Sequence, residues 1–239
     1  MQCEYESHMP LQLNHIEFQG EYYTHYYLCD YKPRSTGSDQ LSQSLIRFKE
    51  GSRLDVEAWT ECATQELGKI PSIERAVIMR ALNSDETDVS LVKQTALDRL
   101  GKKLALEING AYNPHLLMKS RPTKSVKMLT KMEREKELED IYSIDQIETE
   151  NILVIDDILT TGTTMKEIIK AIRRLNTSCL INLFTLADTD HQAVLNQNIA
   201  LSGDSYSWAE EEWAALAEPD EFYIQLEKLK SQILKDSFS

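Results

Sequence analysis

The chain has 239 residues, enough for one substantial domain or two small ones. Its 26 basic and 39 acidic side chains give a net charge of −13, which disfavours nucleic-acid backbones and anionic lipid surfaces as partners. No apolar run approaches the roughly 20 residues of a membrane span, and the N-terminus lacks a signal pattern. The four cysteines lie far apart without a CxxC pair, so we expect a cytoplasmic globular protein with unpaired thiols.

The first third of the chain predicts short extended pieces and two helices. Residues 21–30 have extended character, and residues 32–39 form a cluster of turn-forming residues. Residues 41–48 predict a short helix, and residues 53–67 predict a longer one with an apolar face.

From residue 75 onward the pattern alternates between strand and helix. Three apolar runs are typical of strands buried on both faces: residues 76–79, 151–155 and 179–186. Helical spacing follows from Val89 to Leu104, with Thr87 or Asp88 as the N-cap, and again from Thr163 to Leu175. Strand–helix–strand units with short connections predict a parallel sheet flanked by helices, which is an α/β fold.

The remaining segments are short or highly charged. Residues 115–118 suggest another strand, and residues 119–140 predict a mobile charged loop that leads into a solvent-exposed helix. From Trp208 onward the sequence is acidic and helical, with an apolar seam that we expect to pack on the same domain.

The segment from Ile152 to Thr164 carries the most chemical information. An apolar strand ends in Asp156 and Asp157, and a turn rich in Thr around Gly162 leads directly into a helix. Ligands of open parallel sheets bind beyond the carboxyl ends of the strands, and a helix N-terminus favours an anion. Four threonine hydroxyls and a glycine that permits close backbone approach suit a phosphate monoester.

The two carboxylates suit the sugar that carries such a phosphate. They would repel a phosphate directly, but one step earlier along the chain they can accept hydrogen bonds from sugar hydroxyls. A sugar with a 5-phosphate therefore matches both the carboxylates and the turn that follows them. A P-loop is excluded because its Gly-x4-Gly-Lys-Ser/Thr spacing is absent. A purely structural use of the threonines as caps and turns is the alternative.

This segment closely resembles the 5-phosphoribosyl-1-pyrophosphate (PRPP) motif of type I phosphoribosyltransferases. The resemblance implies that Asp156 and Asp157 hold the ribose hydroxyls. It further implies that the 5-phosphate lies against the following turn, formed by Thr160, Thr161, Gly162, Thr163 and Thr164. Thr160 stands where six-oxopurine salvage enzymes carry an Asp, which argues against hypoxanthine or guanine as the acceptor.

The same resemblance points to a pyrophosphate site. In the family a loop after an earlier strand binds pyrophosphate through backbone amides, and the matching residues here are Arg80, Ala81, Leu82, Asn83 and Ser84. A salt-bridge role for Arg80 is an equal alternative. The charged loop that begins at Lys119 corresponds to the family's flexible loop, where Arg121 and Lys124 would neutralise the departing pyrophosphate. A solvated charged face is the alternative for both side chains.

A narrower resemblance is to the ComF group, phosphoribosyltransferase-like proteins associated with competence. It rests on the helix around residues 45–51 and on the segment Arg121 to Ser125, although the four-cysteine zinc module of that group is missing. The expected organisation is an N-terminal α+β hood (residues 1–70), a type I phosphoribosyltransferase-like core (71–200) and a helical C-terminal extension (201–239).

The resemblance implies transfer of a phosphoribosyl group from PRPP to a small nitrogenous acceptor such as a nucleobase. Mg²⁺ would enter with PRPP and not through direct protein ligands. The alternative is a protein that senses PRPP or a nucleotide without catalysis, or a ComF-like accessory protein. Homodimerisation is compatible with the sequence.

Overall fold

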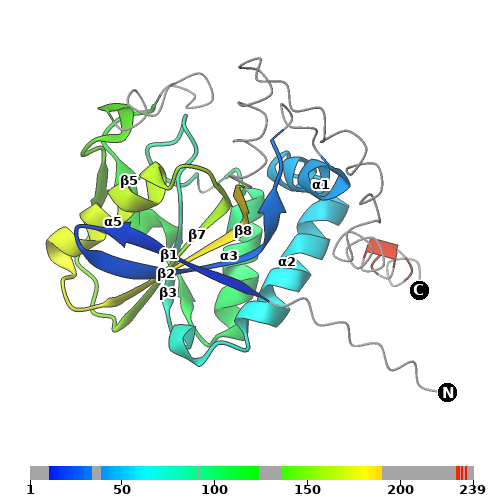
Figure 1. Cartoon of the computed structure of the whole chain (residues 1–239), viewed down its shortest axis with the longest axis horizontal. Helices are drawn as coiled ribbons and strands as arrows, with labels where there is room; N and C mark the ends of the chain where they lie inside the picture. The colour runs from blue at the N-terminus through cyan, green and yellow to red at the C-terminus, as the bar shows by residue number, and fades with distance from the viewer. Residues whose placement is uncertain are drawn as a thin grey trace, which may run out of the picture.

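A computed structural model describes residues 11–33, 39–90, 92–123 and 136–189, together with residues 230, 231, 233 and 235. Its main feature is a six-stranded sheet with the strand order β1-β2-β8-β7-β3-β4 (Figure 1). These strands are β1 (Gln12–Phe18), β2 (Glu21–Tyr31), β3 (Val77–Arg80), β4 (Ala111–Tyr112), β7 (Asn151–Leu159) and β8 (Leu180–Thr189).

The sheet is mostly parallel. Adjacent strands from β2 through β8, β7 and β3 to β4 all pair in parallel, and β1 pairs with β2 in the antiparallel sense. Parallel neighbours need crossover connections, which the helices of this chain supply. The predicted α/β fold, a parallel sheet flanked by helices, is therefore confirmed. One consequence is that β3, β7 and β8 all end at the same edge of the sheet.

Helices cover both faces of this sheet (Figure 1). They are α1 (Gln40–Lys49), α2 (Arg53–Leu67), α3 (Ala96–Glu107) and α5 (Thr163–Leu175). Alternate side chains of β7 point to opposite faces of the sheet. Leu153 and Ile155 pack in one core with α1, α2 and α3. Ile152 and Val154 pack in a second core with α5. The predicted helices at 41–48, 53–67 and 163–175 are confirmed.

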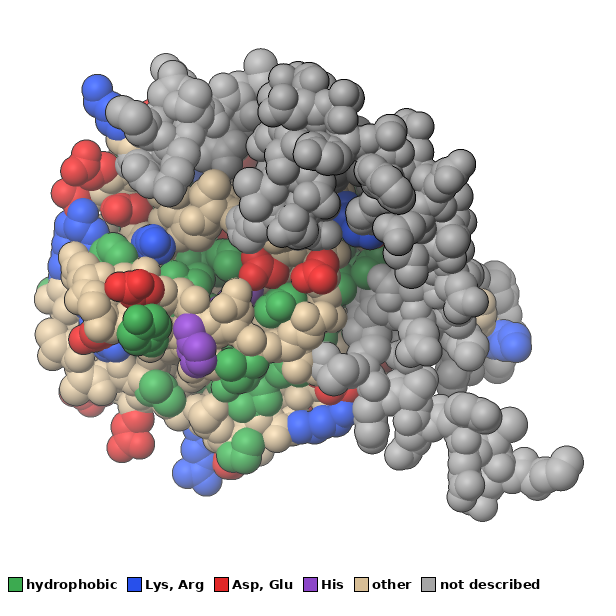
Figure 2. Space-filling model, in the orientation of Figure 1, with side chains coloured by type: hydrophobic (Ala, Val, Ile, Leu, Met, Phe, Trp, Pro, Cys, Tyr) green, Lys and Arg blue, Asp and Glu red, His purple; other side chains and the backbone are tan. Residues whose placement is uncertain are grey.

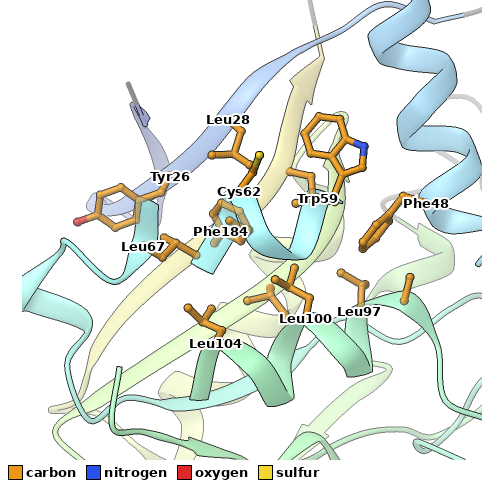
Figure 3. Close-up of a cluster of buried hydrophobic side chains, with 14 of the residues drawn as sticks. Tyr26, Leu28, Phe48, Trp59, Cys62, Leu67, Leu97, Leu100, Leu104 and Phe184 are labelled. Atoms are coloured by element: carbon orange, nitrogen blue, oxygen red, sulfur yellow. The ribbon is translucent and has the colours of Figure 1, made fainter. Parts of the chain in front are cut away.

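The larger core lies between α2, α3 and the sheet. Figure 3 shows Leu97, Leu100 and Leu104 pointing from α3 toward the side chains of α2. Trp59 of α2 is fully buried, and its indole N–H donates to the Ser44 hydroxyl at 3.1 Å. Three cysteines in the described ranges, Cys29, Cys62 and Cys179, have buried side chains.

Helix α3 begins later than the sequence pattern predicts. Its N-cap is Thr95, and Thr95 and Asp98 form a reciprocal capping box. The apolar spacing that suggested a start near Val89 is misleading, because the side chain of Val92 is 94% exposed and belongs to no helix. A strong local cap therefore overrides the apolar periodicity.

The segment expected to form an N-terminal hood contributes to the central sheet itself. Strand β2 pairs with β8 over seven registered residue pairs, and β1 forms the edge beyond it. Helices α1 and α2 share the larger core with α3. The segments 34–38 and most of the expected C-terminal extension, 201–239, lie outside the described residues.

A second, two-stranded antiparallel sheet accompanies the central sheet. It pairs β5 (Leu117–Lys119) with β6 (Tyr142–Ile144), and two short 3₁₀ turns, Pro71–Ile73 and Pro114–Leu116, connect neighbouring elements. Figure 2, in the orientation of Figure 1, shows acidic and basic side chains scattered over the part of the surface that is coloured by residue type. None of the helices in the described part of the chain combines the length and hydropathy of a bilayer-spanning segment.

Gly101 is required by close packing between α3 and β4. A Cβ atom there would overlap the ring of Tyr112, whose hydroxyl is held by Asp98 at 2.7 Å. We expect Gly101→Ala to lower the free energy of unfolding by about 1–3 kcal/mol through overpacking, although alanine ordinarily favours a helix by about 1 kcal/mol over glycine. Thermal unfolding tests this, with Lys102→Ala on the exposed side of α3 as the control; an unchanged or raised Tm for Gly101→Ala would contradict the packing argument.

Candidate functional site

The carboxyl end of β7 brings the predicted site residues together. Residues 152–155 are fully buried, and β7 continues through Asp156 and Asp157 to Leu159, where it still pairs with Asp188 of β8. The strand is thus longer than the predicted 151–155, and the two carboxylates lie within its last residues. The chain then turns through residues 160–162 into α5.

Gly162 is the N-cap residue of α5 and has a left-handed backbone. Its φ and ψ angles are 72° and 0°, and the space around its Cα is open. The backbone conformation is therefore what favours glycine at this position. Within the described residues no side-chain hydrogen bond caps the helix, so the N–H groups of its first turn are left for another acceptor. Together with the positive end of the helix dipole, they favour a bound anion.

The threonines of the turn differ in exposure. Thr160 and Thr161 are exposed, Thr164 is half-buried, and Thr163 is buried at the start of the helix. The hydroxyls of Thr161 and Thr163 lie 3.0 Å apart and share a hydrogen bond. This arrangement surrounds the helix start with hydroxyl and N–H donors, which a phosphate group requires.

A cleft of about 490 Å³ opens beside this turn. The turn and the start of α5 line one side, and β1 and the end of β8 line the other. Its lining residues are Asn14, His15, Ile16, Glu17, Leu159, Thr160, Thr161, Gly162, Lys166 and Asp188. Lys166 places a cation beside the helix start, and Asn14 donates to Asp188 across the opposite wall at 3.4 Å. The turn is thus open to a ligand.

The two carboxylates have different surroundings. Asp157 is 7% exposed, and its carboxylate forms an ion pair with Lys49 in the last turn of α1. Asp156 accepts a hydrogen bond at 2.8 Å from the backbone N–H of Asp157, and Asp157 accepts one at 2.8 Å from Ile158. Lys49 was not predicted as a site residue from the sequence, although its helix was.

Burial raises the pKa of Asp156 well above its usual value, and the adjacent charge of Asp157 raises it further. The ammonium group of Lys49 acts in the opposite direction. Lys49 itself has a raised pKa, because attraction to Asp157 and Asp156 outweighs the effect of its burial. The pair of acids is therefore held in an environment that favours one negative charge over two.

The loop after β3 is organised by a buried arginine. Arg80 is 0% exposed, and its guanidinium donates to Asp98 at 2.7 Å and to both carboxylate oxygens of Glu86 at 2.7 and 2.8 Å. Glu86 also accepts from the backbone N–H of Asn83 at 2.7 Å. The side chain of Arg80 therefore forms salt bridges, as the second alternative from the sequence had it.

Two further residues predicted for pyrophosphate binding are also buried. Ala81 and Leu82 are 4% and 6% exposed, and the backbone N–H of Ala81 donates to the carbonyl of Ile155 at 2.9 Å. Since that N–H extends the pairing of β3 with β7, it is already occupied. A ligand at this loop would meet the residues that follow, from Asn83 onward.

A buried lysine lies next to this loop. Lys119, at the end of β5, is 5% exposed, and its ammonium group donates to the carbonyl of Asn83 at 2.5 Å. The sequence gives little sign of it, because Lys119 merely begins a long charged stretch. Arg121 is exposed and bonds Glu137 at 2.7 Å, and Lys124 lies outside the described residues.

Comparison with protein families gives a match to the chain. The family model described as "Phosphoribosyl transferase domain" matches residues 100–220, which is half of the chain. The match includes β7, the turn at 160–162 and α5, whereas β3 and the loop after it lie outside the matched range. No curated protein matches the chain.

Proposed function

Since the chain belongs to the phosphoribosyl transferase domain family, we propose that it binds PRPP and transfers the phosphoribosyl group to a nitrogen nucleophile such as a nucleobase, releasing pyrophosphate. One observation carries the proposal: β7 carries two carboxylates near its end, and the turn that follows leads into a helix without a side-chain cap hydrogen bond, beside an open cleft. Sugar hydroxyls and a 5-phosphate need those groups in that order.

In this proposal the 5-phosphate binds at the turn from Thr160 to Thr164. Asp156 and Asp157 accept hydrogen bonds from the ribose hydroxyls. When PRPP binds, a ribose hydroxyl donates a hydrogen bond to the carboxylate of Asp157, which is also ion-paired with Lys49. Lys166 adds a positive charge beside the phosphate.

The reaction breaks the bond between C1 of the ribose and a pyrophosphate oxygen and forms a bond between C1 and the nitrogen. Pyrophosphate leaves with the electron pair of the broken bond, and the nitrogen loses its proton to solvent. Positive charge develops on the sugar ring, so positioning and electrostatic stabilisation supply the rate enhancement. In this proposal the carboxylates of β7 supply negative charge that stabilises the developing positive charge on the sugar.

In this proposal Mg²⁺ enters the site bound to the phosphate groups of PRPP. The described residues contain no cluster of three or more acidic, histidine or cysteine side chains able to hold a metal. Mg²⁺ keeps several of its waters and binds substrate phosphates, so in this proposal it enters with PRPP and not through direct protein ligands. When bound, the ion neutralises charge on the departing pyrophosphate.

Binding and turnover test the proposal separately. We expect calorimetry to show PRPP binding in the presence of Mg²⁺, and pyrophosphate release with at least one member of a nucleobase panel. The double variant Asp156→Asn, Asp157→Asn should bind PRPP at least about tenfold more weakly, because each lost charge-assisted hydrogen bond contributes about 1.5–3 kcal/mol. Wild-type affinity in this variant would refute the ribose assignment.

A non-catalytic sensor of PRPP or of a nucleotide is the second candidate. It is favoured by the loop after β3, in which Arg80, Ala81 and Leu82 are buried and the N–H of Ala81 is occupied. A sensor needs to hold the phosphorylated sugar but not to stabilise a leaving group. PRPP binding without pyrophosphate release for any acceptor would favour this candidate.

A further inference from the structure

The last turn of α1 brings a lysine to the acid pair of β7. Lys49 is the final residue of α1, and its ammonium group forms an ion pair with Oδ2 of Asp157. The side chain of Lys49 is 49% exposed, whereas that of Asp157 is 10% exposed. A ligand that approaches Asp157 from solvent therefore meets the ammonium group as well.

Helix α1 is held on the fold close to Lys49, so the position of this ammonium group is defined. Phe48, the preceding residue, is 1% exposed and packs in the larger core (Figure 3). The buried carboxylate of Asp55 accepts hydrogen bonds from Ser44 at 2.5 Å and from Arg47 at 3.1 Å. Apolar packing and charge-assisted hydrogen bonds together keep the last two turns of α1 in place.

The ion pair has hydrogen-bonding capacity left for a ligand. Within the described residues the ammonium group of Lys49 donates to Asp157 alone, so two of its three N–H donors have no partner there. Oδ1 of Asp157 accepts the backbone N–H of Ile158 at 2.8 Å and Oδ2 accepts Lys49, which leaves a lone pair on each oxygen. Donors and acceptors are therefore available side by side.

A hydroxyl is the ligand group that uses both halves of this ion pair. Its hydrogen donates to the carboxylate and its oxygen accepts from the ammonium group. A phosphate would be repelled by Asp157, and an ammonium group would be repelled by Lys49. The neighbouring Asp156 is half-buried and binds the N–H of Asp157 through Oδ1, so its other oxygen can accept a second hydroxyl. Two adjacent hydroxyls on one sugar ring therefore match the three side chains.

We infer that Lys49 binds one ring hydroxyl of the ribose, donating to its oxygen while the same hydroxyl donates to Asp157. This inference rests on the proposed function and adds to the acid pair a ligand from the N-terminal part of the chain. Lys49 lies outside residues 100–220, the range that the family model matches, so the assignment depends on the contacts of this chain alone. A sugar without that hydroxyl loses both hydrogen bonds, and Lys49 thus makes the site selective for ribose over one of its deoxy forms.

Deoxy sugars test the inference because they remove a hydroxyl without changing the protein. Ribose 5-phosphate, 2-deoxyribose 5-phosphate and 3-deoxyribose 5-phosphate are titrated by calorimetry into wild type and Lys49→Met. The variant should bind ribose 5-phosphate at least about tenfold more weakly, because a hydrogen bond from a charged donor is lost. For the deoxy sugar that lacks the bound hydroxyl, most of this difference should disappear. Loss of positive charge alone would weaken the binding of all three sugars equally.

Lys69→Met is the matched control. The side chain of Lys69 is also 49% exposed and is also paired with a carboxylate, that of Glu66, but it lies in the connection from α2 to the start of β3, away from the site. This variant should bind all three sugars as wild type does. Lys49→Arg, which keeps the charge and the N–H donors, should retain the preference for ribose 5-phosphate over the same deoxy sugar.

Each outcome decides the inference. An equal loss for all three sugars in Lys49→Met, or no loss for any of them, overturns the role of Lys49 and leaves the sugar site standing. Wild-type protein that does not bind ribose 5-phosphate overturns the proposed function as well. If Lys49→Met does not fold, the side-chain ammonium signal of Lys49 in ¹⁵N NMR spectra of wild type decides. Bound ribose 5-phosphate should shift this signal, and a signal that stays unchanged at saturation contradicts the inference.

Discussion

Replacing Asp156 by asparagine should stabilise the fold at neutral pH while weakening PRPP binding. Burial and the charge of Asp157 raise the pKa of Asp156, so the folded protein holds a proton there more tightly than the unfolded chain does. The protonated Asp156 therefore stabilises the fold most at low pH, and this stabilisation is lost as the pH rises from the pKa of Asp156 in the unfolded chain toward its pKa in the folded protein. Asparagine keeps the oxygen that accepts the N–H of Asp157 and removes the unfavourable charge.

The expected gain is about 1 kcal/mol or more at neutral pH, which raises Tm by about 2–4 °C for each kcal/mol in a chain of this size. PRPP affinity should fall at least about tenfold. Asp145→Asn, an exposed acid outside the site, is the control for charge removal alone. Because the wild-type carboxyl is protonated in acid, the difference in Tm should vanish there. A lower Tm for Asp156→Asn at neutral pH would contradict this account of the site.

Arg80→Met should destabilise the fold more than Gly101→Ala does. The substitution leaves Asp98, which is 2% exposed, and Glu86 without their cation, and losing one partner of a buried ion pair costs about 3–5 kcal/mol. Because Glu86 also holds the N–H of Asn83, the loop next to Lys119 should lose its shape, and pyrophosphate affinity should fall with stability. Urea unfolding at neutral and acid pH measures the effect.

The pH dependence of this loss has a definite sign. Burial alone would raise the pKa of Asp98, but hydrogen bonds from Tyr112, Thr95 and Arg80 outweigh it and lower the pKa. The stability that Asp98 contributes is therefore present at neutral pH and lost in acid. Arg80→Met should accordingly cost most at neutral pH, and the double variant Arg80→Met, Asp98→Asn should recover part of the loss. A single variant about as stable as wild type would show that the network is not needed.

Much of the fold could be predicted because its signals are local. The apolar run at 152–155 and the amphipathic pattern of 163–175 determine β7 and α5 almost alone. The carboxylates and the glycine turn lie between them in one contiguous segment, so their proximity follows from the chain itself. The roles of Asp156, Asp157 and residues 160–164 as ligands for a phosphorylated sugar remain predictions.

What the sequence did not predict depends on contacts between distant segments. Lys49 reaches Asp157 across 108 residues, and Lys119 reaches Asn83 across 36, and neither lysine stands in a distinctive local pattern. For Arg80 the sequence left a salt-bridge role open, but its partners Glu86 and Asp98 lie on the following loop and on α3 and could not be identified from the local pattern. The sequence of β2 predicts an extended segment, but the pairing of β2 with β8 could not be predicted, because it depends on the assembled sheet.

The central claim is that the turn after β7 and the start of α5 bind the phosphate of a pentose. Amide NMR spectra recorded during titration with ribose 5-phosphate test it most directly. The account predicts saturable shifts for the amide signals of Thr161 to Met165, together with those of Asp156 and Asp157. Signals that stay unchanged at these positions while the ligand binds elsewhere, or that never respond at all, would contradict it.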